Sequence, residues 1–272
     1  MSIAKKVAPF IKWPGGKRWF VQAHLDIIPQ QYNRYIEPFL GGGAVFFGIQ
    51  PLKAILSDTN KELAITYNAI KKDYKRVLSY LQFHKQYHSE EYYYQVRDML
   101  LDDEFEIAAR LIYLNRTCFN GIYRVNKEGK FNVPIGTSSS VIYDTDDFQA
   151  IAQALKHANI FNDDFAKTIG KAREGDLIFA DPPYTVRHNN NGFIQYNEKL
   201  FSWKDQIRLT KCLKRAKDRG VKIIATNANH PSVVDLYRQL EFEIEEITRY
   251  SSISANPENR KQYGEIIITA NI

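Results

Sequence analysis

Short apolar runs alternate with helical patterns along much of this chain, and this alternation limits its fold more than any other feature. Six runs predict strands: Tyr35 to Leu40, Ala54 to Ser57, Leu177 to Ala180, Val221 to Thr226, Phe242 to Ile247 and Glu265 to Thr269. Residues 202–219 show apolar side chains spaced for one helical face, and Gly220 ends that pattern. The alternation predicts an α/β fold of the Rossmann-like, doubly wound kind, with a mostly parallel sheet and flanking helices.

Residues 59–158 have a different pattern. Segments 61–87, 90–101 and 104–115 carry apolar residues at helical spacing, whereas residues 116–140 are rich in glycine and serine and predict loops or a hairpin. We interpret this block as a helical domain inserted into the chain. The predicted division is one domain of residues 1–58 and 159–272 and a second, inserted domain of residues 59–158.

Composition narrows the class of partner and the compartment. The formal net charge is +6 and the pI is about 9.1, which favours an anionic partner, most commonly nucleic acid. Two cysteines are too few for a disulfide framework or a cysteine-rich zinc site, so we expect no metal. The sequence has no run of 18 apolar residues and no signal peptide, and we expect a cytoplasmic protein.

A glycine turn after the first predicted strand indicates a nucleotide-type site. Gly41, Gly42 and Gly43 lie between that strand and a helical segment, at the edge of a parallel sheet where ligands bind. Glycine there lets a ligand approach the backbone closely. Phe46 stands where the dinucleotide fingerprint needs its third glycine, and Ile11 breaks the P-loop pattern before Lys17. Neither NAD nor ATP is favoured.

Asp58 follows the second predicted strand. A carboxylate in that place can accept hydrogen bonds from both hydroxyls of a ribose. Taken alone, Asp58 is equally well explained as a helix N-cap. Together with the glycine turn, it favours a nucleoside cofactor without phosphates, and S-adenosylmethionine is the main candidate.

The segment from Asp181 to Tyr184, with sequence DPPY, ends a buried strand with groups that only accept hydrogen bonds. Proline has no N–H, so the Asp181 carboxylate and the proline carbonyls form a cradle for an amino group, and Tyr184 offers a ring on which a base can stack. A simple turn explains Asp-Pro-Pro but not the aromatic residue that follows. The segment therefore predicts methyl transfer to an exocyclic amine, with catalysis mostly by positioning.

Four segments in order resemble one family over nearly the whole chain. They are K-W-P-G-G-K from Lys12 to Lys17, F-L-G-G-G from Phe39 to Gly43, residues 114–136, and D-P-P-Y. These motifs resemble the Dam-type DNA adenine-N6 methyltransferases of the alpha group. The resemblance implies base flipping, because neither the cradle nor the stacking ring can reach a paired adenine.

The resemblance also implies roles for particular residues. It implies that the cofactor is bound by Trp13, Lys17, Glu37, Phe39, Gly41, Gly43, Asp58, Asp164, Phe165 and Asp181. It implies catalysis by Asp181, Pro182, Pro183 and Tyr184. The plainer interpretations are that Trp13 is a core residue, that Lys17 is a solvated surface charge, and that Asp164 and Phe165 are a helix cap and a core ring.

The residues implied to bind DNA are Lys12, Arg116, Phe119, Asn120, Ile122, Arg124, Phe193 and Tyr196. Residues 109–130 carry an excess of cations, which suits contact with phosphates, and Arg124 fits a guanine reader. We expect the loop that holds Phe193 and Tyr196 to close over the flipped base. Recognition of GATC is the first choice, and a longer site such as GATATC stays open.

Competing functions fit the sequence less well. A cytosine-C5 methyltransferase needs a nucleophilic cysteine, normally after proline, but Thr117 precedes Cys118 and Lys211 precedes Cys212. Cytosine-N4, RNA and protein-amide methylation use related motifs, and residues 114–136 argue for duplex DNA instead. A non-enzymatic DNA-binding module explains the cations but not the glycine turn, Asp58 and DPPY together. We expect a monomer in solution.

Overall fold

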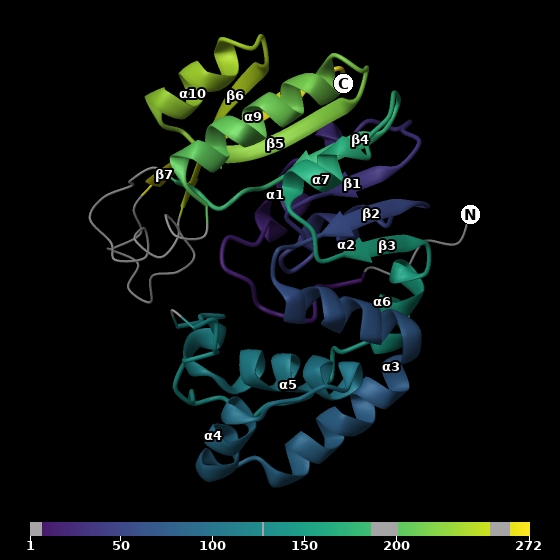
Figure 1. Cartoon of the computed structure of the whole chain (residues 1–272), viewed down its shortest axis with the longest axis vertical. Coiled ribbons are helices and arrows are strands. Elements are labelled where there is room, and N and C mark those ends of the chain that lie inside the picture. The colour runs from purple at the N-terminus through teal and green to yellow at the C-terminus, as the bar shows by residue number, and fades with distance from the viewer. Residues whose placement is uncertain (1–6, 127, 186–200, 251–261) are drawn as a thin grey trace. The chain divides into compact units, whose positions relative to one another are not determined.

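The computed structural model describes residues 7–126, 128–185, 201–250 and 262–272 (Figure 1). The chain divides into two compact units. Unit 1 comprises residues 1–25, 40–52 and 58–162, and unit 2 comprises residues 26–39, 53–57 and 163–272. The whole predicted helical insertion lies in unit 1, together with the N-terminal segment and the glycine turn. The predicted domain boundaries remain a prediction.

Seven strands form one sheet in the order β3-β2-β1-β4-β5-β7-β6. Their bounds are β1 Tyr35–Glu37, β2 Ala54–Ser57, β3 Ala158–Phe161, β4 Leu177–Ala180, β5 Lys222–Ala228, β6 Glu243–Tyr250 and β7 Gln262–Ala270. β1 pairs in parallel with β2 and β4, and β4 pairs in parallel with β5. β7 is antiparallel to both β5 and β6. The expected α/β class with a mostly parallel sheet is confirmed.

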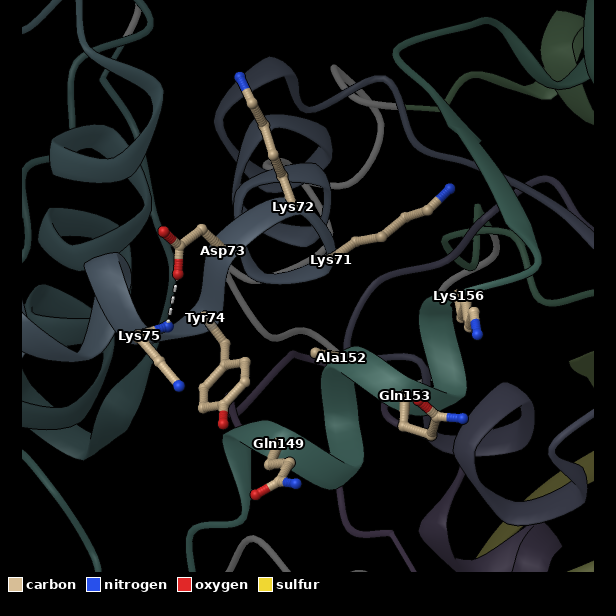
Figure 2. A pocket seen from close by; sticks show the side chains of 9 residues that line it. All are labelled: Lys71, Lys72, Asp73, Tyr74, Lys75, Gln149, Ala152, Gln153 and Lys156. Carbon is tan, nitrogen blue, oxygen red and sulfur yellow. Dashed lines mark hydrogen bonds between the residues drawn. The ribbon is translucent and has the colours of Figure 1, made fainter.

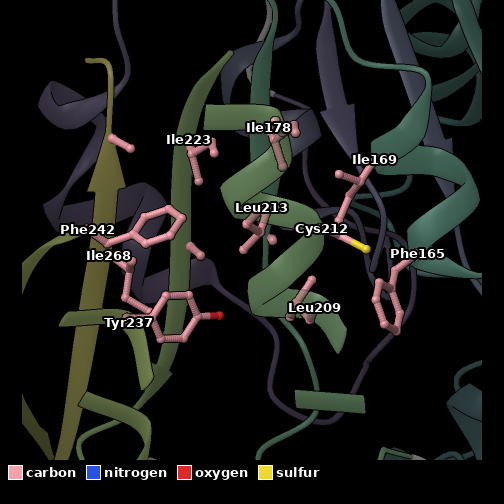
Figure 3. Close-up of a cluster of buried hydrophobic side chains, with 14 of the residues drawn as sticks. Phe165, Ile169, Ile178, Leu209, Cys212, Leu213, Ile223, Tyr237, Phe242 and Ile268 are labelled. Atoms are coloured by element: carbon pink, nitrogen blue, oxygen red, sulfur yellow. The ribbon is translucent and has the colours of Figure 1, made fainter. Parts of the chain in front are cut away.

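Three helices of unit 2 share one buried face with its strands. They are α7 Phe165–Gly170, α9 Trp203–Lys217 and α10 Pro231–Arg238. In Figure 3, Leu209 and Leu213 of α9 lie among Ile178, Ile223 and Ile268 of the strands. A capping box starts α9, since Ser202 and Asp205 each accept the other's backbone N–H. Successive strand residues point to opposite faces, so residues next to these isoleucines point away from the helices.

Unit 1 is mainly helical. It contains α1 Arg18–Ala23, α2 Ala44–Ile49, α3 Lys61–Tyr87, α4 Glu90–Asp98, α5 Glu104–Thr117 and α6 Phe148–Leu155, with short 3₁₀ turns at Leu25–Ile27 and Phe119–Gly121. Asn60, Ser89 and Asp103 cap α3, α4 and α5 through their side chains. Inside α3 the backbone of Asp73 is not helical, and its Oδ1 accepts hydrogen bonds from the backbone N–H groups of Lys75 and Arg76. Asp73 therefore restarts the helix after a kink.

The predicted strands and helices are present, several with bounds that differ by a few residues, whereas α1, α6, α7 and α10 were not predicted. Residues 35–40 form a strand only as far as Glu37, because Pro38 has no N–H for a ladder. The strand β3 was not predicted, since only alternate residues of it are buried and it spans four positions. No helix in the described part of the chain is long and apolar enough to cross a membrane.

Candidate active site and DNA-recognition surface

The register of β4 and β5 brings Asp181 against a threonine. Ala180, the last residue of β4, lies opposite Ala225 of β5, so the next residues along, Asp181 and Thr226, are also neighbours. The Thr226 hydroxyl, which is fully buried, donates a hydrogen bond of 2.8 Å to Asp181 Oδ1. The predicted acceptor thus lies at the carboxyl edge of the parallel strands and has a fixed donor.

Tyr184, the last residue of DPPY, is held by its hydroxyl. The hydroxyl donates a hydrogen bond of 2.8 Å to Oε2 of Glu265, the carboxylate of which is 1% exposed at the start of the apolar run of β7. Pro182 is buried, whereas Tyr184 is only partly buried. Anchoring the hydroxyl while the ring stays partly accessible is the arrangement that a stacking platform needs.

Glu37 lies at the end of β1, beside β4. It is 3% exposed and accepts a hydrogen bond of 2.9 Å from the hydroxyl of Tyr35. Burial raises the pKa of Tyr35 well above its ordinary value, and the carboxylates of Glu37 and Asp181 raise it further. Since Ile36 belongs to the helix-covered core, Tyr35 and Glu37 point to the opposite face of the sheet.

Three further predicted cofactor residues of unit 2 pack as structural residues do. The ring of Phe165 is buried and stacks on Phe39, with centroids 5.4 Å apart. Asp164 caps α7 through the N–H of Ala166, and both its oxygens accept from Arg208 at 2.7 and 2.8 Å. The Arg208 guanidinium is the main cause that lowers the pKa of Asp164. The cap and the core ring suffice to explain Asp164 and Phe165, and a cofactor role for them stays a prediction.

In unit 1, Asp58 ties the glycine turn to the start of α3. Its Oδ2 accepts from the N–H of Gly41 at 3.0 Å, and its Oδ1 accepts from the N–H of Asn60 at 2.9 Å. Burial raises the pKa of Asp58, and these two hydrogen bonds oppose that shift. The N-cap of α3 is Asn60, so the explanation of Asp58 as the cap is wrong. The Tyr67 hydroxyl also donates to the carbonyl of Gly41, at 3.0 Å.

Trp13 occupies the space next to the glycine turn. A Cβ on Gly41, which has φ +48°, would lie 2.7 Å from Cδ1 of the indole. The close approach that Gly41 permits in this structure is therefore that of Trp13. The other side of the indole stacks on Tyr123, with ring centroids 4.9 Å apart and an angle of 26°.

Gly43, the last residue of the turn, is the N-cap of α2 and also has a left-handed backbone. Lys17 precedes α1 and is 5% exposed, so its interpretation as a solvated surface charge is wrong. Its Nζ donates to the carbonyl of Gly15 at 3.0 Å. A buried ammonium group next to a turn of this kind is a candidate for ligand binding.

Within residues 116–140, predicted as loops or a hairpin, the structure has a hairpin. Antiparallel bridges join Cys118 to Ile135 and Val125 to Phe131. Arg124 is exposed, and its Nε donates to Oδ1 of Asn132 across the hairpin at 2.9 Å. At the base of the hairpin, the Phe119 ring is 53% exposed. The hairpin thus presents an aromatic ring and an oriented guanidinium to solvent.

Two more residues of the predicted DNA-binding set follow Phe119 in the chain. Asn120 is exposed and has a left-handed backbone with φ +56°, and Ile122 is half-buried. Lys12 is also exposed. Its backbone N–H and carbonyl both pair with the side-chain amide of Asn115, at 2.8 Å each, and Asn115 is 1% exposed. Asn115 was not predicted, since nothing local marks its partner 103 residues away.

The prediction that Arg116 contacts DNA is corrected by its burial. Arg116 is 3% exposed, and its guanidinium donates to both carboxylate oxygens of Asp146, at 2.5 and 2.8 Å, and to the carbonyls of Phe10 and Val141. Arg110 is likewise buried and donates to Glu62 and to the carbonyls of Val96 and Arg97. Both arginines hold unit 1 together instead of facing a nucleic acid.

Sequence comparison decides the family. Residues 13–253 match the family described as D12 class N6 adenine-specific DNA methyltransferases. The chain belongs to this family. The type II methyltransferase M1.LlaDCHI of Lactococcus lactis subsp. cremoris is 36% identical over 270 residues, which cover 96% of this chain and 94% of that protein. A DNA adenine methylase of Haemophilus influenzae is 31% identical, over 96% of this chain and 93% of that protein.

This D12-class chain is therefore an enzyme that methylates adenine N6 in DNA, as the resemblance implied. Its cysteines fit that chemistry, since adenine-N6 transfer needs no thiol nucleophile. Cys118 and Cys212 are both buried, and burial raises the pKa of Cys118 to about 11. Neither thiol has the access that a nucleophile for cytosine-C5 transfer would require.

Some predicted residues of the methyltransferase are not placed. Phe193, Tyr196 and the loop that carries them, as well as Lys127, lie outside the described residues. Among the residues that are described, no group of three His, Cys, Asp or Glu side chains is arranged to hold a metal ion.

A pocket of about 510 Å³ lies in unit 1 beside the kink of α3 (Figure 2). Its lining includes Lys71, Lys72, Lys75 and Lys156 but none of the predicted site residues. Lys71 donates to the carbonyl of Ala158, and Lys72 pairs with Glu104. Half of its ammonium groups are thus already engaged by the protein.

Proposed function

We propose that this methyltransferase takes the methyl group from S-adenosylmethionine and transfers it to N6 of an adenine flipped out of a specific duplex site, with GATC as the first choice. The observation that carries the proposal is the end of β4. There the Asp181 carboxylate, held by Thr226, is followed by two residues without N–H groups and by the tethered ring of Tyr184. This set accepts hydrogen bonds from an amine and gives a base a surface for stacking.

Three charged residues, Lys17, Glu37 and Asp58, each fit a chemical group of the proposed cofactor. S-Adenosylmethionine carries a carboxylate, an ammonium, ribose hydroxyls and a sulfonium, and when bound it supplies the methyl carbon. Lys17 is a buried cation that suits the carboxylate, and Glu37 is a buried anion that suits the ammonium. The Asp58 carboxylate accepts from backbone N–H groups, including those of Gly41 and Asn60, and its two oxygens together offer about four lone pairs, so it can also accept from ribose hydroxyls. Trp13, beside the glycine turn of the same unit as Lys17 and Asp58, keeps its proposed role in binding the cofactor.

Asp181 and the carbonyl of Pro182 would accept the two N–H bonds of the adenine amine. This would orient the nitrogen lone pair toward the methyl carbon. The C–N bond would form as the bond from that carbon to the sulfonium breaks, with its electron pair staying on sulfur, and the Asp181 carboxylate would take one N6 proton and pass it to water. Alignment of this kind is where enzymes gain much of their rate without a covalent intermediate. The chain's own contribution to the reaction is thus mainly geometric.

Flipping the adenine costs a few kcal/mol, and stacking on one ring returns roughly 1–3 kcal/mol. Tyr184 alone therefore does not balance the cost. We propose that the remainder comes from the segment that holds Phe193 and Tyr196 and from the exposed hairpin. In the hairpin, Phe119 and Asn120 would contact the target, and Arg124 would read a guanine through O6 and N7.

Target sequence is tested by expressing the protein in cells without adenine methylation and sequencing N6-methyladenine in their DNA. GATC alone as the modified motif supports the proposal, and GATATC alone supports the second candidate. The Asp181→Ala variant in the same cells should leave no N6-methyladenine. Full modification by that variant would refute the role given to the β4 edge.

A further inference from the structure

Two residues outside the DPPY segment hold the two side chains on which its proposed chemistry depends. Thr226 of β5 donates to Asp181, and Glu265 of β7 accepts from Tyr184, each at 2.8 Å. We propose that Thr226 and Glu265 are positioning residues for methyl transfer. Thr226 fixes the rotamer of the carboxylate and Glu265 fixes the ring of the stacking platform. This proposal rests on the function proposed above for Asp181 and Tyr184.

The sheet register places both residues on the required face. Ile223 and Ala225 point to the core shared with α9, so Thr226 points to the other face of β5. On β7, Ile266 and Ile268 belong to the same core, so Glu265 also points away from it. Glu265 lies opposite Ala228, two residues beyond Thr226 along β5. The strands β4, β5 and β7, which are neighbours in the sheet, therefore place the DPPY segment, Thr226 and Glu265 on one face and at one edge.

Burial makes both contacts costly to lose. Thr226 is 0% exposed and Glu265 is 1% exposed. A buried carboxylate requires hydrogen-bond donors, and the Tyr184 hydroxyl is one of them. For the same reason the hydroxyl of Tyr184 is held at a fixed place, and its ring can turn only about the line from Cβ to the oxygen. Neither residue belongs to the hydrophobic cluster that α7, α9 and α10 share with the strands.

The test for Thr226 compares Thr226→Val with Thr226→Ser and with Thr210→Val. Valine keeps the shape and removes the hydroxyl. We expect kcat to fall about 10- to 100-fold, because a misplaced catalytic group costs on the order of 10²-fold. KM for DNA and S-adenosylmethionine binding should change little, and any fall in Tm should be matched by Thr210→Val, which also loses a buried hydroxyl. Serine should restore kcat to within about 3-fold. Thr210 is an equally buried threonine, bonded to the carbonyl of Gln206, and Thr210→Val should keep wild-type kcat.

The test for Glu265 is a double-variant cycle with Tyr184→Phe, which keeps the ring and removes the hydroxyl. Glu265→Gln keeps an acceptor and should retain most of kcat, whereas Glu265→Leu should lower it about 10-fold or more. If Glu265 acts through Tyr184, the double variant Tyr184→Phe/Glu265→Leu is no slower than the slower single variant. Effects that multiply would overturn the role of Glu265. The cycle uses relative rates of folded variants, so it remains decisive if Thr226→Val fails to fold.

Failure of this proposal differs from failure of the proposed function. If Asp181→Ala is inactive but Thr226→Val and Thr210→Val both transfer at the wild-type rate, Thr226 is not a positioning residue and the function stands. If Asp181→Ala is fully active, the function assigned to DPPY falls and the positioning proposal falls with it.

Discussion

The carboxyl edge of the sheet in unit 2 and the cation-rich segment 109–130 in unit 1 place their charged side chains in different ways. At the sheet edge, Asp181 lies where a strand end must place it. In segment 109–130, Arg110 and Arg116 are buried and bonded to carbonyls and carboxylates of their own unit. The position of a residue at a strand end is fixed by the backbone. The direction of a long cationic side chain depends on the residues that pack around it.

The largest expected effect on activity tests Asp181 at the carboxyl edge of the sheet. Asp181→Ala should lower kcat by about 10³-fold or more, the upper range for the loss of one preorganised electrostatic partner. Single-turnover methylation of a duplex oligonucleotide measures it. Thermal unfolding checks the fold, and its midpoint should stay well above the assay temperature because Asp181 follows β4 and lies outside the helix-covered core. If activity falls only because Tm falls, Asp181 has a structural role like that of the buried arginines.

The next effect tests the buried arginine. Arg116→Met leaves the Asp146 carboxylate buried without its main partner, and the free energy of unfolding should fall by about 3–5 kcal/mol. Urea denaturation measures this change. Arg116→Met/Asp146→Leu removes both charges and should recover much of the loss. Lys130→Ala, which breaks an ion pair exposed at both ends, should cost less than about 1 kcal/mol. If Arg116→Met instead keeps its stability and loses affinity for DNA, Arg116 faces the nucleic acid after all.

A histidine of unit 1 supplies a third test, through pH. His84, bonded to the Tyr92 hydroxyl, is buried, and burial lowers its pKa to about 4 from 6.5. Between those values the unfolded chain binds a proton that the folded chain does not, so acid destabilises the fold. From pH 7 to 4.5, wild type should lose up to about 3 kcal/mol more unfolding free energy than His84→Gln. Equal losses in urea titrations at both pH values would contradict this.

The smallest expected effect compares two arginines within residues 109–130. Arg124, unlike Arg116, is exposed, and Arg124→Ala should cost roughly 1–3 kcal/mol at one base pair of the site. Methylation rates on a set of singly substituted duplexes measure it. Lys130→Ala should weaken all duplexes alike and reduce the salt dependence of binding. An equal loss on every duplex for Arg124→Ala would make it a phosphate contact.

Local sequence predicts what the local backbone determines. The bounds of α3, β2 and β4 agree with their apolar patterns, and DPPY could be placed because it directly follows a buried strand. Thr226 and Glu265 could not be found in this way. Their roles depend on the register of β5 with β4 and on an antiparallel β7 inserted beside it, and a single sequence carries no signal for either.

The burial of Arg110 and Arg116 could not be predicted, for a related reason. The partners of Arg116 come from residues as distant as Phe10 and Asp146, so its burial is a property of the assembled unit. The same holds for Asn115, which pairs with the backbone of Lys12. A polar residue in the middle of a helix gives no indication of which distant segment it will meet.

The indole of Trp13 is packed between the glycine turn and Tyr123, and a Cβ on Gly121 would lie 2.5 Å from Cδ of Lys12. The base of the hairpin therefore packs against Lys12 and Trp13 of the N-terminal segment. Engineers who wish to alter the target of this enzyme can start from Arg124, which is exposed. Transplanting the whole hairpin from a relative would require residues 12 and 13 to be carried with it.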